Sequence, residues 1–128
     1  MHNYNQTHII ISAEKSTANT LDNIRRSAEL EAVLESSGMS FKRAIGRFRG
    51  TEETSYVVRT HTRGEVYYLR KLASEFQQES VLEVTQGHGW LLLTGGGEEY
   101  IGTIVNASGQ EESYTQVGSK LFTLKKGA

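Results

Sequence analysis

The chain has 128 residues, which is the size of a single domain. It contains neither cysteine nor proline, so disulfides, thiolate nucleophiles, cysteine-bound metals and cis-proline turns are excluded. Its 14 Lys and Arg residues and 15 Asp and Glu residues give a formal net charge of -1, which argues against a general nucleic-acid-binding protein.

The hydropathy pattern also argues against a membrane protein. The longest apolar runs, such as residues 9–11 and 91–93, are far too short to cross a bilayer. The first residues lack the basic start and apolar stretch of a secretory signal. With no disulfides either, we expect a cytoplasmic location and no membrane partner.

The N-terminal half of the chain predicts a strand, a helix and a pair of strands. Residues 8–12 form a short apolar strand. A helix is expected to begin after Ser16 or Thr17, which are candidate N-caps, and to stop at Gly38. Residues 40–49 and 54–60 then have strand composition, and we expect them to pair as a hairpin.

Apolar residues lie on two opposite sides of this first helix. Leu30 and Leu34 occupy one side. The other side carries a stripe at helical spacing, made of Leu21, Ile24, Ala28 and Ala32. Two interpretations stay open: the helix is covered by its own sheet and by a second subunit, or the boundary is wrong or some of these leucines are simply exposed.

The second half predicts another helix and more strands. The helix after residues 62–65 has one apolar face, consisting of Val66, Leu69, Leu72, Ala73 and Phe76. Strands are expected at residues 81–84, 90–94, 100–105 and 114–124, with Gly118 a turn or bulge in the last. The order predicts an α+β fold: a ferredoxin-like βαββαβ sandwich with extra C-terminal strands, a single domain over residues 1–128. Oligomerisation would cover the open face of its sheet.

Several candidate motifs are better explained by structure than by chemistry. The glycine run at residues 95–97 lacks the Lys-Ser/Thr of a phosphate-binding loop, so a hairpin turn is favoured. The histidines do not have zinc spacing, and no metal is expected; His88, beside Trp90, is the one in a site-like setting. One basic cluster consists of Lys42, Arg43, Arg47 and Arg49. The net charge of -1 and the acidic residues that follow the cluster argue against a general nucleic-acid-binding face.

The acidic pair Glu52-Glu53 is the most suggestive constellation. It joins two expected strands, with Phe48 just before it and Tyr56 just after it. Neighbouring carboxylates shift each other's pKa values, and together with aromatic rings they can hold a cationic ligand that carries a ring. The pairs at residues 98–99 and 111–112 are interpreted as solvated turns.

Four segments together resemble the small phage S-adenosylmethionine hydrolase family, now understood as S-adenosylmethionine lyases. They are Ile11-Ser12-Ala13-x-Lys15-Ser16, Gly46-x-Phe48-Arg49, Thr51-Glu52-Glu53 before a Val-rich strand that ends at Arg59, and residues 69–82 with Leu72-Ala73, Glu75 and Gln78. The resemblance covers about residues 8–95 and leaves the C-terminal third unmatched.

The resemblance implies a PII-like homotrimer with ligand sites between subunits. It implies cleavage of S-adenosylmethionine to 5′-methylthioadenosine and homoserine lactone, in which the substrate's own carboxylate displaces the thioether and no cofactor or metal takes part. The family's required glutamate matches Glu53, with Glu52 beside it. The family's site tyrosine falls at Phe48, which has no hydroxyl, and Tyr56 is the candidate to replace it.

The remaining substrate-binding candidates implied by the resemblance are Ser12 and Ser16, at the end of the first strand. Two non-enzymatic alternatives stay open. One is a trimeric phage module that binds or sequesters S-adenosylmethionine or a nucleotide, which would explain Phe48. The other is a phage inhibitor that docks on a host protein.

Overall fold

The computed structural model describes residues 6–127 apart from residue 49, and it leaves the side chain of Phe48 undescribed. Within these residues the chain forms eight strands and two helices. In order they are β1 (Thr7–Ser12), α1 (Thr20–Ser36), β2 (Phe41–Phe48), β3 (Thr51–Thr60), α2 (Arg63–Glu75), β4 (Ser80–Thr85), β5 (His88–Leu93), β6 (Glu98–Asn106), β7 (Tyr114–Val117) and β8 (Lys120–Lys125).

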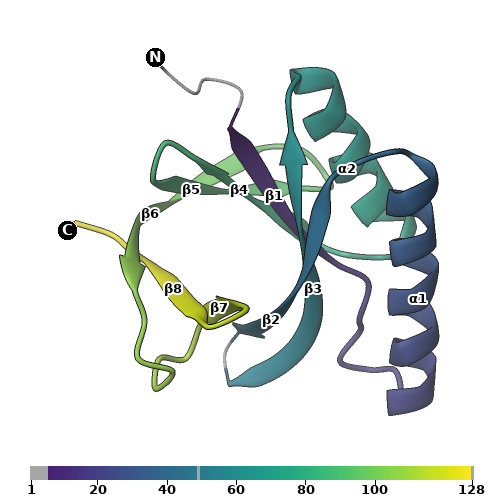
Figure 1. Cartoon of the computed structure of the whole chain (residues 1–128), viewed down its shortest axis with the longest axis horizontal. Coiled ribbons are helices and arrows are strands. Elements are labelled where there is room, and N and C mark those ends of the chain that lie inside the picture. The colour runs from purple at the N-terminus through teal and green to yellow at the C-terminus, as the bar shows by residue number, and fades with distance from the viewer. Residues whose placement is uncertain (1–5, 49, 128) are drawn as a thin grey trace.

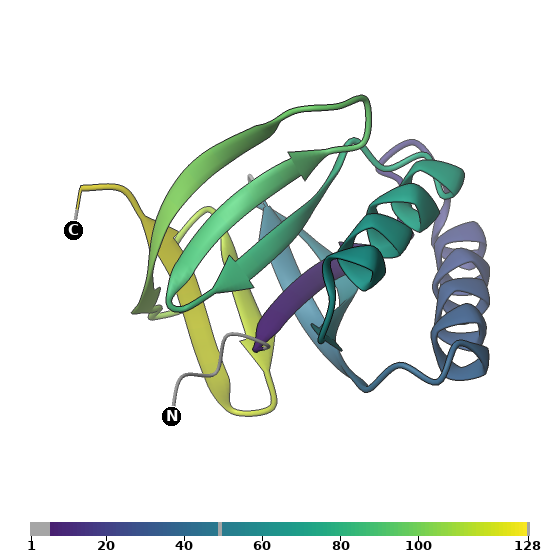
Figure 2. The same cartoon turned by 90° about the horizontal axis from the view of Figure 1, so that it is seen from above.

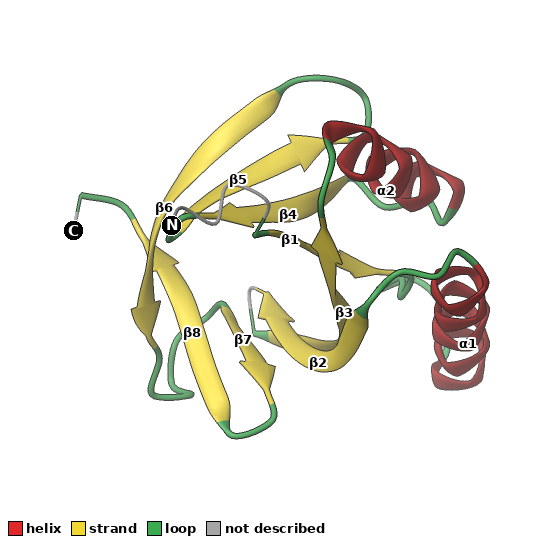
Figure 3. Cartoon of the chain, turned by 45° about the horizontal axis from the view of Figure 1, so that its top comes forward, coloured by secondary structure: helices red, strands yellow, loops and turns green. Residues whose placement is uncertain are grey.

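The strands close into one antiparallel barrel in the order β1-β3-β2-β7-β8-β6-β5-β4 (Figures 1 and 3). The expected βαββαβ order of the first six elements is confirmed. The ferredoxin-like sandwich is wrong, because β5, β6, β8 and β7 continue the sheet from β4 round to β2. The open sheet face expected of the sandwich is therefore replaced by the barrel interior, and the helices cover part of the outer face.

The last expected strand, over residues 114–124, is a hairpin of two strands. Strands β7 and β8 pair through Val117 and Lys120, and Gly118 lies in the turn between them with a φ of 61°. Strand β7 also pairs with β2, where Ile45 lies opposite Gln116. This short ladder closes the barrel.

Both helices pack on the same side of the barrel, as Figures 1 and 2 show. The main core lies between the helices and the outer face of β1, β3 and β4, and Leu92 of β5 adds to it. Its fully buried members include Ile9, Ile11, Tyr56, Val58, Leu30, Leu34, Leu69, Val81 and Leu92. The expected apolar face of α2 is confirmed: Val66, Leu69, Leu72 and Ala73 are buried and Phe76 packs against them.

On α1 the shorter apolar side is the one that packs on the sheet. Leu30 and Leu34 are 0% exposed, whereas Leu21 and Ile24 of the longer stripe are 63% and 61% exposed. The helix begins later than expected, because residues 15–18 form a turn and Asn19 is the N-cap. Its side chain accepts a hydrogen bond from the backbone of Asp22, while the expected stop at Gly38 is confirmed by a φ of 72°.

The barrel interior is lined by the alternate residues of each strand. Since Ile9 and Ile11 face the helices, Ile10 and Ser12 face the interior. A Cβ atom on Gly89 of β5 would lie 2.7 Å from the side chain of Leu124 on β8, so Leu124 helps to fill this space. The apolar residues Ile10, Val57, Leu82, Leu91 and Leu124 are nonetheless only half-buried. Among the described helices, none is long and apolar enough to cross a membrane.

Candidate functional site

The acidic pair is split between the two faces of the barrel wall. Strand β3 alternates, so Tyr56 and Val58 face the helices and Glu53 lies on the interior face with Ser55. Glu52 therefore lies on the outer face. Although adjacent in sequence, the two carboxylates have different surroundings and cannot act on one small ligand from the same side of this strand.

Glu53 is half-buried at one end of the barrel interior. Burial raises the pKa of its carboxyl from the usual 4.5 to about 7, and the negative charge of Glu14 adds to the rise, against a smaller opposing effect of the Ser12 hydroxyl. Its neighbour in the register on β2 is Gly46, which has no side chain to screen it. Glu53 is thus a carboxyl that changes its charge near neutral pH.

The end of β1 is fixed beside Glu53 by hydrogen bonds. The Ser12 hydroxyl donates to the carbonyl oxygen of Thr54 at 2.8 Å and accepts from the backbone N–H of Glu14 at 3.2 Å. The Glu14 carboxylate accepts from the backbone N–H of Thr54 at 2.8 Å. The structure therefore brings Ser12 and Glu53 together, as the resemblance implies, and adds Glu14.

Glu52 is held on the outer face by residues of neighbouring strands. It accepts a hydrogen bond from the Tyr114 hydroxyl at 3.0 Å, and the guanidinium of Arg47 lies 3.9 Å away. The same guanidinium lies over the Tyr114 ring at 6.0 Å. This cluster ties β3 to β2 and β7, next to the ladder that closes the barrel.

Tyr56 also lies away from Glu53, on the helix side of β3. Its ring is buried in the core and meets Phe41 edge-on, with 5.8 Å between ring centroids. Its hydroxyl donates to the carbonyl oxygen of Ser27 on α1 at 3.1 Å. Burial first, and the hydrogen bond with Glu31 second, raise the pKa of this hydroxyl. Within one chain the structure does not bring the Tyr56 hydroxyl to Glu53.

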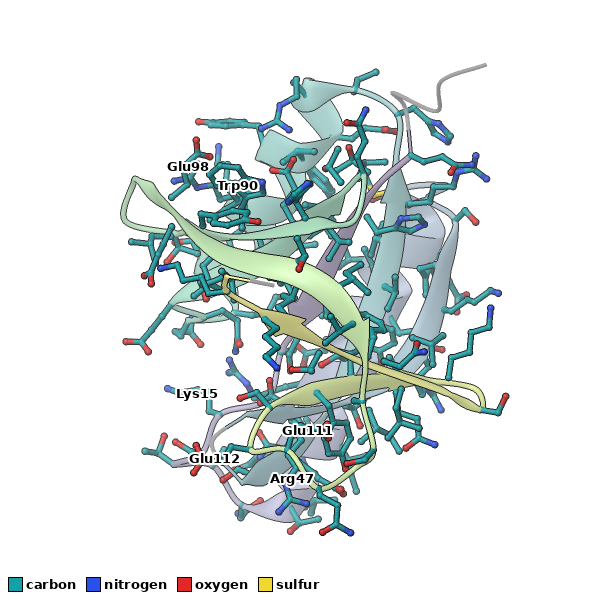
Figure 4. All side chains as sticks on the ribbon, turned by 90° about the vertical axis from the view of Figure 1, so that its left-hand side faces the viewer. Lys15, Arg47, Trp90, Glu98, Glu111 and Glu112 are labelled. Atoms are coloured by element: carbon teal, nitrogen blue, oxygen red, sulfur yellow. The ribbon has the colours of Figure 1, made fainter. Side chains whose placement is uncertain are left out.

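The two remaining candidates lie at the same end of the barrel. The backbone of Phe48 pairs with Thr51 at the β2–β3 turn, but its side chain is outside the described residues. Ser16 is exposed in the turn before α1. Next to this turn is an open surface hollow of about 360 Å³, lined by Lys15, Thr17, Ala18, Asp22, Arg25 and Arg26. Figure 4 shows Lys15 and Arg47 at this end, with Glu111 and Glu112.

Sequence reasoning missed Glu14 and this hollow. Glu14 is the unspecified position in the segment Ala13-x-Lys15, and its sequence neighbours gave no signal. Its importance appears only when β1 and β3 are paired, 40 residues apart in the chain. A lone carboxylate in a loop is ordinarily solvated.

His88 and Trp90 form a separate aromatic cluster at the opposite end of the molecule, where Figure 4 labels Trp90 with Glu98. The His88 Nδ1 atom lies 2.9 Å from the Tyr100 hydroxyl, and the Trp90 and Tyr100 rings are 4.9 Å apart. The glycines at 95–97 connect β5 to β6, which confirms the hairpin turn. Over the described ranges, no group of three or more His, Asp or Glu side chains is arranged to hold a metal ion.

The inner face of the closed barrel thus carries the titratable carboxyl of Glu53, with the Glu14 carboxylate beside it. The family model described as the S-adenosylmethionine lyase family matches residues 9–125, and the chain belongs to that family. Both the resemblance and the lyase activity on S-adenosylmethionine are thereby confirmed, and the alternative of a module that only binds S-adenosylmethionine or a nucleotide is not favoured. The match extends through the C-terminal third. Comparison with curated proteins gives no match.

Proposed function

We propose that the protein cleaves S-adenosylmethionine by intramolecular displacement. A carboxylate oxygen of the substrate attacks the γ-carbon of its methionine portion, and the bond from that carbon to sulfur breaks. The bonding electron pair stays on sulfur, which leaves as the neutral thioether of 5′-methylthioadenosine, and the new C–O bond closes homoserine lactone. No proton is gained or lost, so the protein supplies conformation and electrostatics rather than acid–base chemistry.

The observation that carries this proposal is the position of Glu53, half-buried on the interior face next to Ser12. Ionised, it attracts the sulfonium and the ammonium of the substrate. The sulfonium charge disappears as the bond breaks, so pairing with it stabilises the bound substrate more than the transition state. The ammonium keeps its charge throughout, and a carboxylate that holds it can orient the attacking group at no such cost.

The interior of the barrel favours the same reaction. Attack of a carboxylate on a sulfonium compound removes a pair of opposite charges, and such a step is faster where water does not stabilise those charges. The half-buried residues Ile10, Val57 and Leu82 give this face an apolar surface. Binding of the substrate against it would displace water from both reacting groups.

The other predicted site residues have different support. Ser12 shares the interior face with Glu53 and can position its carboxyl, and Ser16 lies in the turn that follows. Phe48 would offer a ring to the adenine. Tyr114 and Arg47 contact one carboxylate oxygen of Glu52, and the Tyr56 hydroxyl donates to Ser27. Both side chains lie on the outer face of β3, so a role beside Glu53 requires a rearrangement or a second subunit.

We also propose the homotrimer with shared sites, and a cytoplasmic location. The exposed stripe on α1 supports an assembly, because Leu21 and Ile24 are large apolar side chains left in water on a helix that already packs its other face. Sedimentation of the wild type and of Ile24→Ser tests it. We expect a trimer that the substitution weakens, and a wild type that stays monomeric at micromolar concentration would contradict the shared site.

The reaction is tested by incubating the protein with S-adenosylmethionine in ¹⁸O-labelled water. We expect equal amounts of methylthioadenosine and homoserine lactone, and no label in the side-chain oxygen of the homoserine portion. Label at that oxygen would show that water is the nucleophile. Glu53→Gln should lower kcat/KM by about 100-fold, within the range of about 2–5 kcal/mol for the loss of one partner of a buried charge pair. Glu98→Gln, at the other end of the molecule, is the matched control and should stay active.

A further inference from the structure

We propose that Glu14 is a positioning residue of this lyase, which acts through Glu53. Its side chain fixes the peptide that follows Glu53, and its negative charge stands beside the Glu53 carboxyl so that the two groups respond together to a cationic substrate. The part of this inference that concerns catalysis rests on the role proposed for Glu53. The inference that the two carboxyls interact does not depend on that role.

The first argument is the way Glu14 is held. It lies just beyond the end of β1, outside the regular ladder. Its carboxylate accepts the Thr54 N–H, its own N–H donates to the Ser12 hydroxyl, and its carbonyl oxygen accepts from the side-chain amide of Gln78 at 2.9 Å. These contacts come from β3, β1 and the segment after α2. Glu14 is therefore fixed by three parts of the fold rather than free in solvent.

The second argument is which atom Glu14 binds. The Thr54 N–H belongs to the peptide unit that joins Glu53 to Thr54, so the hydrogen bond fixes the backbone from which the Glu53 side chain projects. The Ser12 hydroxyl binds the carbonyl oxygen of Thr54, the next peptide along. Two consecutive peptide units of β3 are thus tied to the segment 12–14.

The third argument is charge. On β2, Glu53 lies opposite Gly46, and beyond it Thr115 of β7 is uncharged. Arg47 lies with Glu52 on the outer face, and Lys15, Arg25 and Arg26 line the neighbouring hollow. Among the groups that act on Glu53, Glu14 is the charged one, and it raises the Glu53 pKa. S-adenosylmethionine carries two positive centres, and binding of either relieves the repulsion between the two carboxyls.

Two substitutions separate the charge of Glu14 from its hydrogen bond. Glu14→Gln keeps an oxygen that can accept the Thr54 N–H but removes the charge, while Glu14→Ala removes both. The readout is the ¹³C titration of the Glu53 side-chain carboxyl in the full chain without substrate. We expect Glu14→Gln to lower its midpoint by about one pH unit, as removal of a close like charge should. Glu98→Gln, the distant control, should leave the midpoint unchanged.

The same variants give a kinetic readout that a merely structural residue would not move. The pH at which kcat/KM reaches half its maximum should shift with the Glu53 midpoint in Glu14→Gln, and KM should rise because one negative charge is lost. Glu14→Ala should also lower kcat, because the peptide after Glu53 is released. An unchanged midpoint and pH profile in Glu14→Gln, with only a loss of stability, would overturn the proposal.

One measurement does not depend on the variants folding. In the wild type without substrate, the midpoint of the Glu53 signal should lie near pH 7, because burial and the neighbouring charge of Glu14 both raise its pKa. A midpoint near 4.5 would overturn the pairing. If the midpoint is raised but no product forms from S-adenosylmethionine, the proposed reaction is wrong and the interaction of the two carboxyls remains.

Discussion

Glu53→Gln should make the folded protein more stable at pH 8 while it removes the group that the reaction needs. In the unfolded chain this carboxyl has a pKa near 4.5, and in the folded protein the pKa is about 7. Between these values the folded state keeps a proton that the unfolded state has lost, so stability falls as the pH rises through this window. Above pH 7 the full cost of the ionised, half-buried carboxylate is present.

The size of this effect follows from the shift. A rise from 4.5 to about 7 corresponds to at most about 3 kcal/mol. Water reaches part of the Glu53 carboxyl and screens it, so we expect about 1–2 kcal/mol. Gln is neutral and nearly the same size, so it takes the place of the protonated glutamic acid without the cost of ionisation.

Urea unfolding of the wild type and Glu53→Gln, at pH 4.5 and pH 8 and one protein concentration, measures this difference. The free energy of unfolding of the variant should exceed that of the wild type by about 1–2 kcal/mol at pH 8, and by much less at pH 4.5. Glu52→Gln is the matched control, because Gln can still accept a hydrogen bond from Tyr114; its change in the free energy of unfolding at pH 8 should stay within about 0.5 kcal/mol. A gain for Glu53→Gln that is the same at both pH values would refute the reasoning.

Three further predictions test the fold by urea unfolding. Gly102→Ala should lower the free energy of unfolding by about 2–4 kcal/mol, because the φ of Gly102 is 140° and a Cβ atom would lie 2.5 Å from the Lys125 backbone. An unchanged stability would contradict the close approach of β6 and β8. Thr62→Ala should cost about 1 kcal/mol by removing the capping box of α2, whereas Thr62→Ser should keep it. Leu30→Ala should cost about 2–5 kcal/mol and Leu21→Ala less than about 0.5 kcal/mol in dilute protein; equal losses would mean that the packed face of α1 is misassigned.

The local elements could be predicted because their signals are local. The apolar spacing of α2, the stop at Gly38 and the composition of residues 54–60 each act within a few residues. The closure of the barrel could not be predicted from the sequence, because it depends on β7 pairing with β2. These strands lie about 70 residues apart in the chain and pair through three residue pairs. Residues 114–124 alternate only weakly between apolar and polar side chains, so this segment does not show which strand it will meet.

The same limit applies to α1 and to the site. Both sides of α1 are apolar, so periodicity could not show that Leu34 rather than Ile24 would meet the sheet. Strand alternation does predict that Glu52 and Glu53 face opposite ways. The side that becomes the barrel interior is set by where the helices pack, and this is also what places Tyr56 in the core.

The position of β1 in the barrel has a consequence for how the chain folds. This first strand lies between β3 and β4, so Thr7 pairs with Thr60 on one side and with Thr85 on the other. Contacts so distant in sequence make folding slow, since long loops must close before the pairing stabilises them. The chain has no proline, so no prolyl isomerisation contributes a slow phase. Any slow refolding step should therefore report insertion of β1, closure of the barrel or assembly of subunits.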